Sequence, residues 1–383
     1  MDHPIIDADG HAIEYLPYIY DLFATLGGAK AVDGFRVLVD GLAMIRSLSV
    51  EDRVALRRVP HGLVGPGRRR HRPRQRHAAE AVPRAARRGS SLDLAIVHPT
   101  YGLLAIGIHD PDVRIPVARA FNRYYAEQYA PYGDRILPAA TIPVHTPDEA
   151  VAELDYAIRR ARSQGRDAER LTSCGRVPAR PIRRGAHWVD TLGLNSAHDY
   201  DPLWRRCARA RRRADVHALS ALGLDTHESP GSYVYNKLGS FAGSLHALCR
   251  SLVLGGVLHR FPSLHFAFLE GGAGWAAMLY ADLLAHWAKR NAEAVRQYDP
   301  RRLDRKRLRA LFEEHGSSAI RQRLADLDDC LHPLSDPDDP LLDDFGRSGI
   351  GGPDDVRRMF AAQLLLRLAK PTTRSTRGRS TRA

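Results

Sequence analysis

The chain has 383 residues, of which 44% are hydrophobic, so it can bury a sizeable core in one large domain or two ordinary ones. No stretch reaches the roughly 18 apolar residues of a membrane-spanning helix, and the first residues lack the apolar region of a secretion signal. The four cysteines are widely spaced and form no CxxC pair, which argues against a disulfide framework and a zinc knuckle. We therefore expect a soluble cytoplasmic protein with no membrane partner.

The formal net charge of +13 is distributed very unevenly along the chain. Four arginine-rich segments together carry +29, which leaves −16 for the remaining residues. These segments are residues 57–88, 159–184, 205–213 and 367–383. The acidic remainder is typical of an enzyme body, so the positive charge belongs to the four segments and not to the fold.

Strand and helix patterns alternate in the first half of the chain, outside these segments. IIDADGH, at residues 5–11, predicts a short buried strand, and SLDLAIVHPTYG predicts a second one that ends at Pro99 and Gly102. Residues 110–130 begin with an Asp-Pro helix start and repeat apolar side chains at helical spacing. ILPAATIP then predicts another strand, and residues 146–161 predict a second capped amphipathic helix.

The alternation returns later in the chain, in SLVLGGVLHRFPSLHFAFLEGGAGWAAMLYADLLAHWAKRN. LHFAFLE predicts a buried strand, Gly271 and Gly272 predict a turn, and a long amphipathic helix follows from Trp275. Strands that alternate with helices predict a parallel sheet, either open or closed into a barrel.

The arginine-rich segments show no hydrophobic period and admit three interpretations. Mixtures of Arg, Ala, Pro and Gly arise when a GC-rich gene is read out of frame, but they also occur in solvated basic loops and in arms that bind nucleic acid. The segments lack aromatic side chains that would stack on bases, which disfavours nucleic acid as a partner.

Asp9 and His11 have the spacing of a pair of metal ligands. Residues i and i+2 of a strand point to the same side, so a carboxylate and an imidazole can converge on one ion at the strand's end. The alternative is that both side chains only cap a turn. Glu270 ends the later strand beside a glycine turn, where a carboxylate can ligate a metal or act as a general base. Its alternative role is to cap the helix that begins near Trp275.

Four segments, in order, resemble the amidohydrolase-related family that includes aminocarboxymuconate semialdehyde decarboxylase. They are IIDADGH, HPTYGL, residues 110–154 and GGVLHRFPSLHFAFLEGGAGW. The resemblance covers roughly residues 1–56, 92–158 and 188–316. It implies a (β/α)8 TIM barrel of the metal-dependent hydrolase type, with its site at the carboxyl ends of the strands.

The resemblance also implies a metal site and a type of reaction. Asp9 and His11 occupy the places of the two ligands from the family's first strand, and His217 is the candidate for a histidine ligand after the fifth. Glu270 stands in the family's His-Gly-Gly or Glu-Gly-Gly turn, and it and His217 are the candidates for proton transfer. The alternative for His217 is an ordinary loop histidine. The implied cofactor is a divalent ion, with zinc as the first choice and manganese or iron as the alternatives. This ion activates a water molecule that attacks a carboxylated or amide-type small molecule.

The end of the chain departs from the family's pattern, because no strand followed by an acidic residue precedes its last, arginine-rich residues. We expect one barrel domain over residues 1–360, irregular basic segments at 57–91 and 159–187, and a disordered basic tail at 361–383. A barrel without its last strands leaves two edges with open hydrogen-bonding groups, so we expect an unstable or inactive protein. The competing functional hypothesis is a non-catalytic relic, or a nucleic-acid-binding protein that uses the basic segments.

Overall fold

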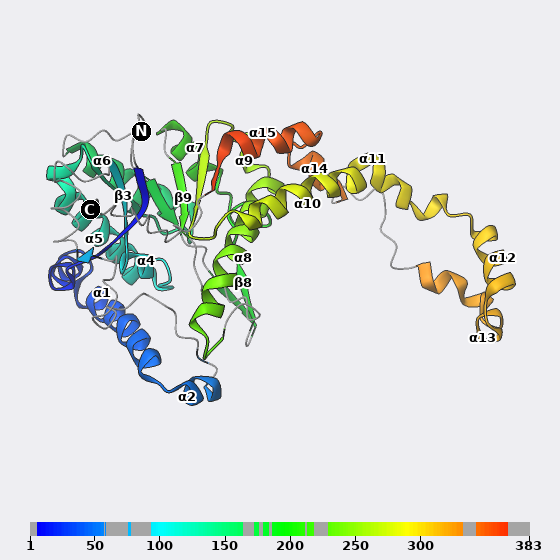
Figure 1. Ribbon diagram of the computed structural model, residues 1–383, viewed down its shortest axis with the longest axis horizontal. Coiled ribbons are helices and arrows are strands. Elements are labelled where there is room, and N and C mark those ends of the chain that lie inside the picture. The colour runs from blue at the N-terminus through cyan, green and yellow to red at the C-terminus, as the bar shows by residue number, and fades with distance from the viewer. Residues whose placement is uncertain are drawn as a thin grey trace, which may run out of the picture.

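Two sheets of short parallel strands form the centre of the computed structural model (Figure 1). The structure describes residues 6–56, 58, 76–77, 93–163, 172–175, 179–183, 186–210, 213–217, 229–331 and 342–366. The first sheet has the strand order β2-β1-β3-β4, and the second has the order β11-β10-β9-β6-β5. The strands of the two sheets are β1 (Ile6–Ile13), β2 (Arg76–His77), β3 (Leu94–Pro99), β4 (Ile136–Pro138), β5 (Ala140–Thr141), β6 (Thr172–Gly175), β9 (Arg213–His217), β10 (His265–Leu269) and β11 (Leu364–Leu366).

The two sheets follow one another along the chain. Only Ala139 separates β4 from β5, and its backbone N–H donates to the Val97 carbonyl of β3 at 2.9 Å. Apart from β2 and the antiparallel hairpin of β7 (Ala179–Arg183) and β8 (Ala186–Val189), each strand follows its neighbour in chain order. Every pairing within the two sheets is parallel, which confirms the predicted α/β class. The outer strands are β2 and β4 in the first sheet and β11 and β5 in the second, and no pairing between described residues joins β2 to β11.

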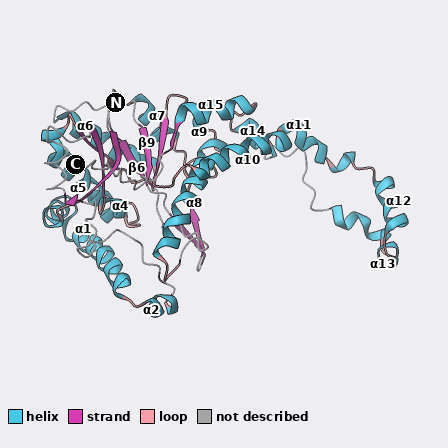
Figure 2. Cartoon of the chain, viewed as in Figure 1, coloured by secondary structure: helices cyan, strands magenta, loops and turns pink. Residues whose placement is uncertain are grey.

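Helices connect the strands and surround them (Figure 2). The helices are α1 (Leu16–Ser47), α2 (Val50–Ala55), α4 (Gly102–Ala105), α5 (Pro111–Tyr129), α6 (Pro147–Ser163), α7 (Asp201–Arg209), α8 (Tyr233–Leu254), α9 (Val257–Arg260), α10 (Gly274–Arg290), α11 (Ala292–Val295), α12 (Arg305–His315), α13 (Ser318–Arg321), α14 (Asp344–Arg347) and α15 (Pro353–Gln363). Asp110 accepts a hydrogen bond from the Asp112 N–H and so caps α5, as its sequence predicts. Within the described residues we find no helix with the length and hydrophobicity of a membrane span.

Regular structure extends into two segments that we expected to be irregular. The helical period of α6 continues to Ser163, and β6, β7 and β8 lie within residues 164–189. At the other end, α15 runs to Gln363, and Leu364–Leu366 form β11, because this apolar run pairs with Phe266–Phe268 of β10. Of residues 57–91 only Arg58 and β2 are described, and residues 367–383 lie outside the described part, so their predicted disorder stays a prediction.

The first hydrophobic core lies between α1, α5 and the first sheet, and its buried members fall between Ala12 and Ile136. The rings of Phe23 and Phe35 of α1 each lie 5.6 Å from the ring of Phe121 of α5, and they lie 5.0 Å from one another. α1 can approach α5 this closely because it presents a glycine there, since a Cβ on Gly27 would lie 2.6 Å from Pro116.

The second core lies around β10, and its buried members run from Ala140 to Leu364. Phe266 of β10 packs against Trp204 of α7, and Phe268 packs against Trp275 of α10, with centroids 5.4 and 5.3 Å apart. The two cores therefore divide the chain at Ala139, where β4 gives way to β5.

Buried polar groups link the two cores where α5 packs on α6. Arg114 makes two hydrogen bonds to the carboxylate of Glu149, at 2.7 and 2.8 Å. Asn122 donates to the Thr141 carbonyl and to the Glu153 carboxylate, both at 2.9 Å. A buried group that loses its partner costs about 1 to 3 kcal/mol, so these bonds fix how α5 lies on α6.

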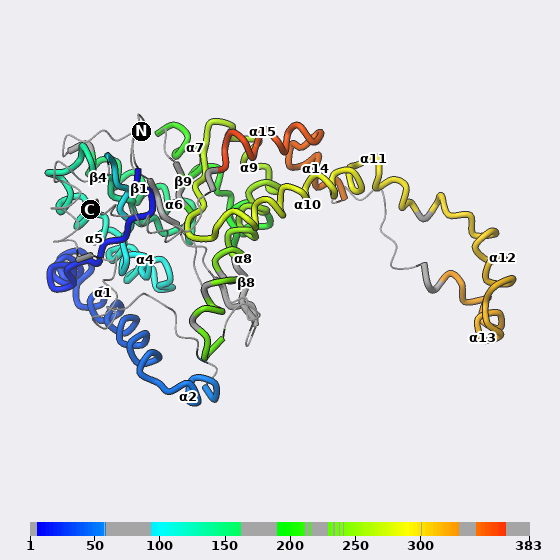
Figure 3. The backbone as a smooth tube through the Cα atoms, viewed as in Figure 1, coloured from blue at the N-terminus to red at the C-terminus, as the bar shows by residue number. Residues whose placement is uncertain are grey.

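An arm of short helices projects from the body beyond α10 (Figure 3). It comprises α11, α12, α13 and the 3-10 helix η6 (Leu324–Leu331), and exposed ion pairs, such as Arg305 with Asp328 at 2.6 Å, connect its segments. Leu324 is the one side chain of this arm that is buried among the residues described. The arm thus adds little to either core.

We expect Phe121→Ala to lower the free energy of unfolding by about 3 to 5 kcal/mol, because it leaves a cavity between α1 and α5 that the surrounding rings cannot fill. Ile115→Ala on the same helix is the matched control, since Ile115 is 36% exposed. Urea unfolding followed by circular dichroism measures both variants. Equal losses of stability in the two variants would contradict this account of the core.

Candidate metal centre

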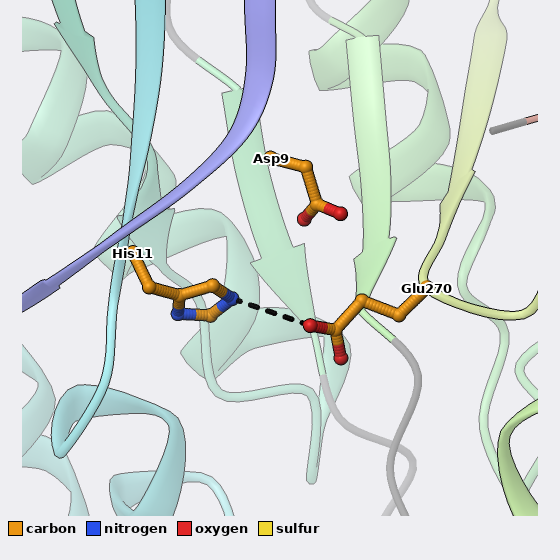
Figure 4. Close-up of side chains that lie close together, drawn as sticks. All are labelled: Asp9, His11 and Glu270. Carbon is orange, nitrogen blue, oxygen red and sulfur yellow. Dashed lines mark ion pairs between the residues drawn. The ribbon is translucent and has the colours of Figure 1, made fainter. Parts of the chain in front are cut away.

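Three side chains from two distant parts of the chain meet at the carboxyl edge of the strands (Figure 4). Asp9 and His11 come from β1, and Glu270 directly follows β10. Their potential ligand atoms all lie within 4.8 Å of one another, and His11 Nε2 lies 3.8 Å from Glu270 Oε1. The structure therefore brings together three of the four residues that the sequence nominates as metal ligands.

A β-bulge in β1 shapes the first half of this cluster. Asp7 pairs with Ala95 and Gly10 pairs with Val97, so β1 contains one more residue than β3 over this interval. The Asp7 carboxylate accepts a hydrogen bond from the Asp9 N–H at 3.3 Å. Bulges redirect the side chains near them, and this one includes Asp9. Regular strand alternation alone therefore does not describe how Asp9 and His11 come to face Glu270.

The backbone of Glu270 is held in the left-handed region, with φ of 64°. Non-glycine residues pay about 1 to 3 kcal/mol for such a conformation, and they are concentrated at functional sites. Gly271 and Gly272 follow at once, and Gly272 also has a positive φ. The turn thus directs the Glu270 carboxylate toward His11. A glycine at this position would adopt the same positive φ without the loss of conformational free energy.

His217, the fourth predicted ligand, is described only in its backbone. It is the last residue of β9 and pairs with Leu269, the residue before Glu270. Its side chain lies outside the described part of the structure, so its role as ligand or proton carrier stays a prediction.

His98 is a neighbour of the cluster that our reading of the sequence did not single out. It lies in β3, opposite His11 in the strand register, and its side chain is fully buried. The rings of His98 and His11 are 5.9 Å apart, and His98 Nε2 lies 3.3 Å from the Ala8 carbonyl oxygen. A polar residue inside an apolar strand, one position before Pro99, was the available signal.

Glu14 is a second residue that the sequence did not nominate. It follows β1 and accepts hydrogen bonds from the backbone N–H groups of Tyr101 and Gly102, at 3.0 and 3.1 Å. Burial raises the pKa of its carboxyl group to about 7. Glu14 thus ties the chain after β1 to the turn after β3, next to the cluster.

The three converging residues fit a divalent metal ion. An ion with bonds of about 2.1 Å keeps its ligand atoms roughly 3 to 4 Å apart, and the His11 to Glu270 distance of 3.8 Å is in this range. Two carboxylates and an imidazole suit zinc, manganese and iron. Three protein ligands also leave coordination positions open, as catalytic metal sites require.

A parallel α/β body with carboxylates and a histidine gathered at the carboxyl ends of its strands is the arrangement of a metal-dependent α/β enzyme. The family model described as Amidohydrolase matches residues 6–320 of this chain. The chain belongs to the amidohydrolase family, which confirms the resemblance found in its sequence. None of the curated proteins compared with the chain matches it.

Solved structures similar to the chain include amidohydrolases and decarboxylases. An amidohydrolase from Mycobacterium avium subsp. paratuberculosis K-10 is 20% identical, with 52% of this chain and 50% of that chain covered and a TM-score of 0.41. The chain thus spans half the length of that relative. The 5-carboxyvanillate decarboxylase from Sphingomonas paucimobilis is 15% identical, with 74% and 72% covered and a TM-score of 0.46.

A third similar structure is the 5-carboxyvanillate decarboxylase from Novosphingobium aromaticivorans DSM 12444, complexed with manganese and 4-hydroxy-3-methoxy-5-nitrobenzoic acid. It is 17% identical, with 79% of this chain and 73% of that chain covered and a TM-score of 0.44.

We expect Glu270→Gly to raise the free energy of unfolding of the metal-free protein by about 1 kcal/mol relative to Glu270→Gln, because glycine adopts a positive φ without strain. Both variants lack the carboxylate, so the comparison isolates the backbone. Urea unfolding in the presence of a chelator measures the difference. If Glu270→Gly were less stable than Glu270→Gln, the backbone at residue 270 would not be strained as we infer.

Glu14 makes the stability of the protein depend on pH. Unfolded glutamate ionises near pH 4.5, whereas Glu14 in the folded protein keeps its proton up to a pKa of about 7. Its contribution to stability is therefore full below pH 4.5 and is lost as the pH rises through 7. The loss amounts to about 3 kcal/mol.

We expect Glu14→Gln to flatten this decline, since an amide does not titrate. Free energies of unfolding measured between pH 4.5 and 7.5 for both proteins test the expectation. The same decline in the variant would assign the pH dependence to other groups.

Proposed function

We propose that this chain is a metal-dependent hydrolase or decarboxylase that acts on a carboxylated or amide-type small molecule. The observation that carries the proposal is the meeting of Asp9, His11 and Glu270 at the carboxyl edge of the strands. Membership of the amidohydrolase family supports an enzyme of this kind.

Within this proposal Asp9, His11 and Glu270 hold the metal ion, and His217 is a fourth ligand. The end of β9 lies beside the end of β10, which supports the place of His217 in the set. A bound divalent ion would polarise a substrate carbonyl and lower the pKa of a water molecule. Glu270 is the more exposed partner of the His11 pair, at 31% against 16%, so it is the group placed to exchange a proton with substrate or water.

The finer features of the proposal concern the metal, the barrel and the compartment. Zinc is our first assignment, because three protein ligands with an open position are typical of its catalytic sites, and manganese or iron is the alternative. The strand order supports a (β/α)8 barrel that is incomplete between β2 and β11. The free thiols of the buried Cys207 and Cys249 support a cytoplasmic location.

Metal binding tests the site directly. We expect the protein, stripped with a chelator and dialysed, to bind one Zn²⁺ or Mn²⁺ ion in isothermal titration calorimetry. Asp9→Asn and His11→Ala should each weaken binding by more than about 100-fold, since even outer-shell partners of metal ligands contribute 10- to 100-fold. Asp21→Asn and His315→Ala, at exposed positions, are the matched controls and should bind as the wild type does.

A wild type that binds neither ion, or controls that lose affinity as the ligand variants do, would overturn the metal site. Activity is then assayed with the metal-loaded protein on aromatic and unsaturated carboxylic acids, for release of carbon dioxide, and on carboxamides and lactones, for hydrolysis. Turnover that a chelator abolishes and the same ion restores supports the proposal. Turnover that is unaffected by the chelator contradicts it.

A further inference from the structure

His98 occupies a position where a polar side chain needs a specific partner. It is fully buried in β3, and a buried imidazole without hydrogen bonds costs a few kcal/mol, about 1 to 3 for each group left unsatisfied. Its Nε2 lies 3.3 Å from the carbonyl oxygen of Ala8. Because a carbonyl oxygen only accepts hydrogen bonds, this contact requires a proton on Nε2.

Ala8 belongs to the bulge in β1. The register of β1 against β3 shifts between Asp7 and Gly10, so the residues between them do not follow the regular ladder of hydrogen bonds. The carbonyl oxygen of Ala8, directly before Asp9, is therefore in hydrogen-bonding contact with His98 of the neighbouring strand β3. The His98 ring therefore lies in contact with the peptide that leads into Asp9.

His98 also contacts the second ligand of β1. Its ring lies 5.9 Å from the ring of His11, with a tilt of 39°. One buried side chain thus touches both the backbone that presents Asp9 and the imidazole of His11. The described residues whose ligand atoms converge are Asp9, His11 and Glu270, and His98 is not among them, so it acts through these groups.

We propose that His98 is a positioning residue, which donates a hydrogen bond from Nε2 to the Ala8 carbonyl and thereby holds the β1 bulge in the shape that presents Asp9 and His11 to one ion. The inference rests on the proposed metal site and adds a determinant of its affinity. It predicts that the donor at Nε2, and not only the size of the ring, sets how tightly the ion binds.

Two substitutions separate these contributions. His98→Phe keeps a ring of similar size but removes the donor, and His98→Gln keeps an N–H donor near the position of Nε2. We expect His98→Phe to weaken Zn²⁺ or Mn²⁺ binding by 10- to 100-fold, as the loss of groups that orient metal ligands typically does, and His98→Gln to recover most of that loss. Thr100→Val is the matched control, because Thr100 is buried just beyond β3 and its hydroxyl has no hydrogen-bond partner among the residues that the structure describes.

Titration calorimetry on the full chain gives the affinities, and urea unfolding of the metal-free proteins shows whether each variant is folded. A second readout needs no metal. Nitrogen-15 NMR of the metal-free wild type should show His98 as the neutral Nε2–H tautomer. That tautomer, a weakened His98→Phe and a recovered His98→Gln support the proposal.

Three outcomes overturn it. His98→Phe, folded, binds the ion as tightly as the wild type; His98→Gln is weakened as much as His98→Phe; or His98 carries its proton on Nδ1. If His98→Phe does not fold, the affinity of His98→Gln relative to the wild type and the position of the proton on His98 decide. If the wild type binds neither ion, the proposed metal site fails and this inference falls with it, whereas failure among the variants alone removes only the role of His98.

Discussion

The site depends on one constraint, which is that every strand pairing in the two sheets is parallel. Parallel strands end at the same edge, so residues at the ends of β1 and β10 are neighbours although most of the chain separates them. Each connection must return across the body, and the helices that do so supply the two cores. The carboxyl edge then gathers polar side chains from several strands without exposing the apolar ones.

Both strands that supply the cluster depart from regular geometry at the residues that matter. β1 has its bulge at Asp9, and the chain after β10 has a positive φ at Glu270. Each departure costs free energy, and the surrounding structure offsets that cost. His98 bonds the bulge, and Glu14 anchors the turn after β3. Departures from regular backbone geometry occur mainly at functional sites, and here both departures lie at the cluster of Asp9, His11 and Glu270.

The sequence predicted the parts of the structure that depend on periodicity. Apolar runs located β3 and β10, helical spacing located α5, α6 and α10, and residue chemistry nominated Asp9, His11 and Glu270, which the structure brings together. It did not predict the bulge, because alternation carries no information on register. It also missed His98, whose partner is a backbone carbonyl of another strand. β11 was assigned to a tail, because three leucines beside an arginine-rich run give no period.

The division of the chain at Ala139 has a consequence for how the site comes into being. The buried hydrophobic side chains that the structure describes in the first core all lie at or before Ile136, so this apolar core can close during synthesis before Glu270 has been made. Asp9 and His11 then belong to a half of the molecule that folds first, and the Glu270 carboxylate joins them only when the second half has folded. If the proposed ion is held by all three residues, it would connect the two halves, and at 100 times its dissociation constant it would favour the docked state by about 2.7 kcal/mol. Besides its role in the reaction, the metal ion would then stabilise the association of the two halves in the last step of folding.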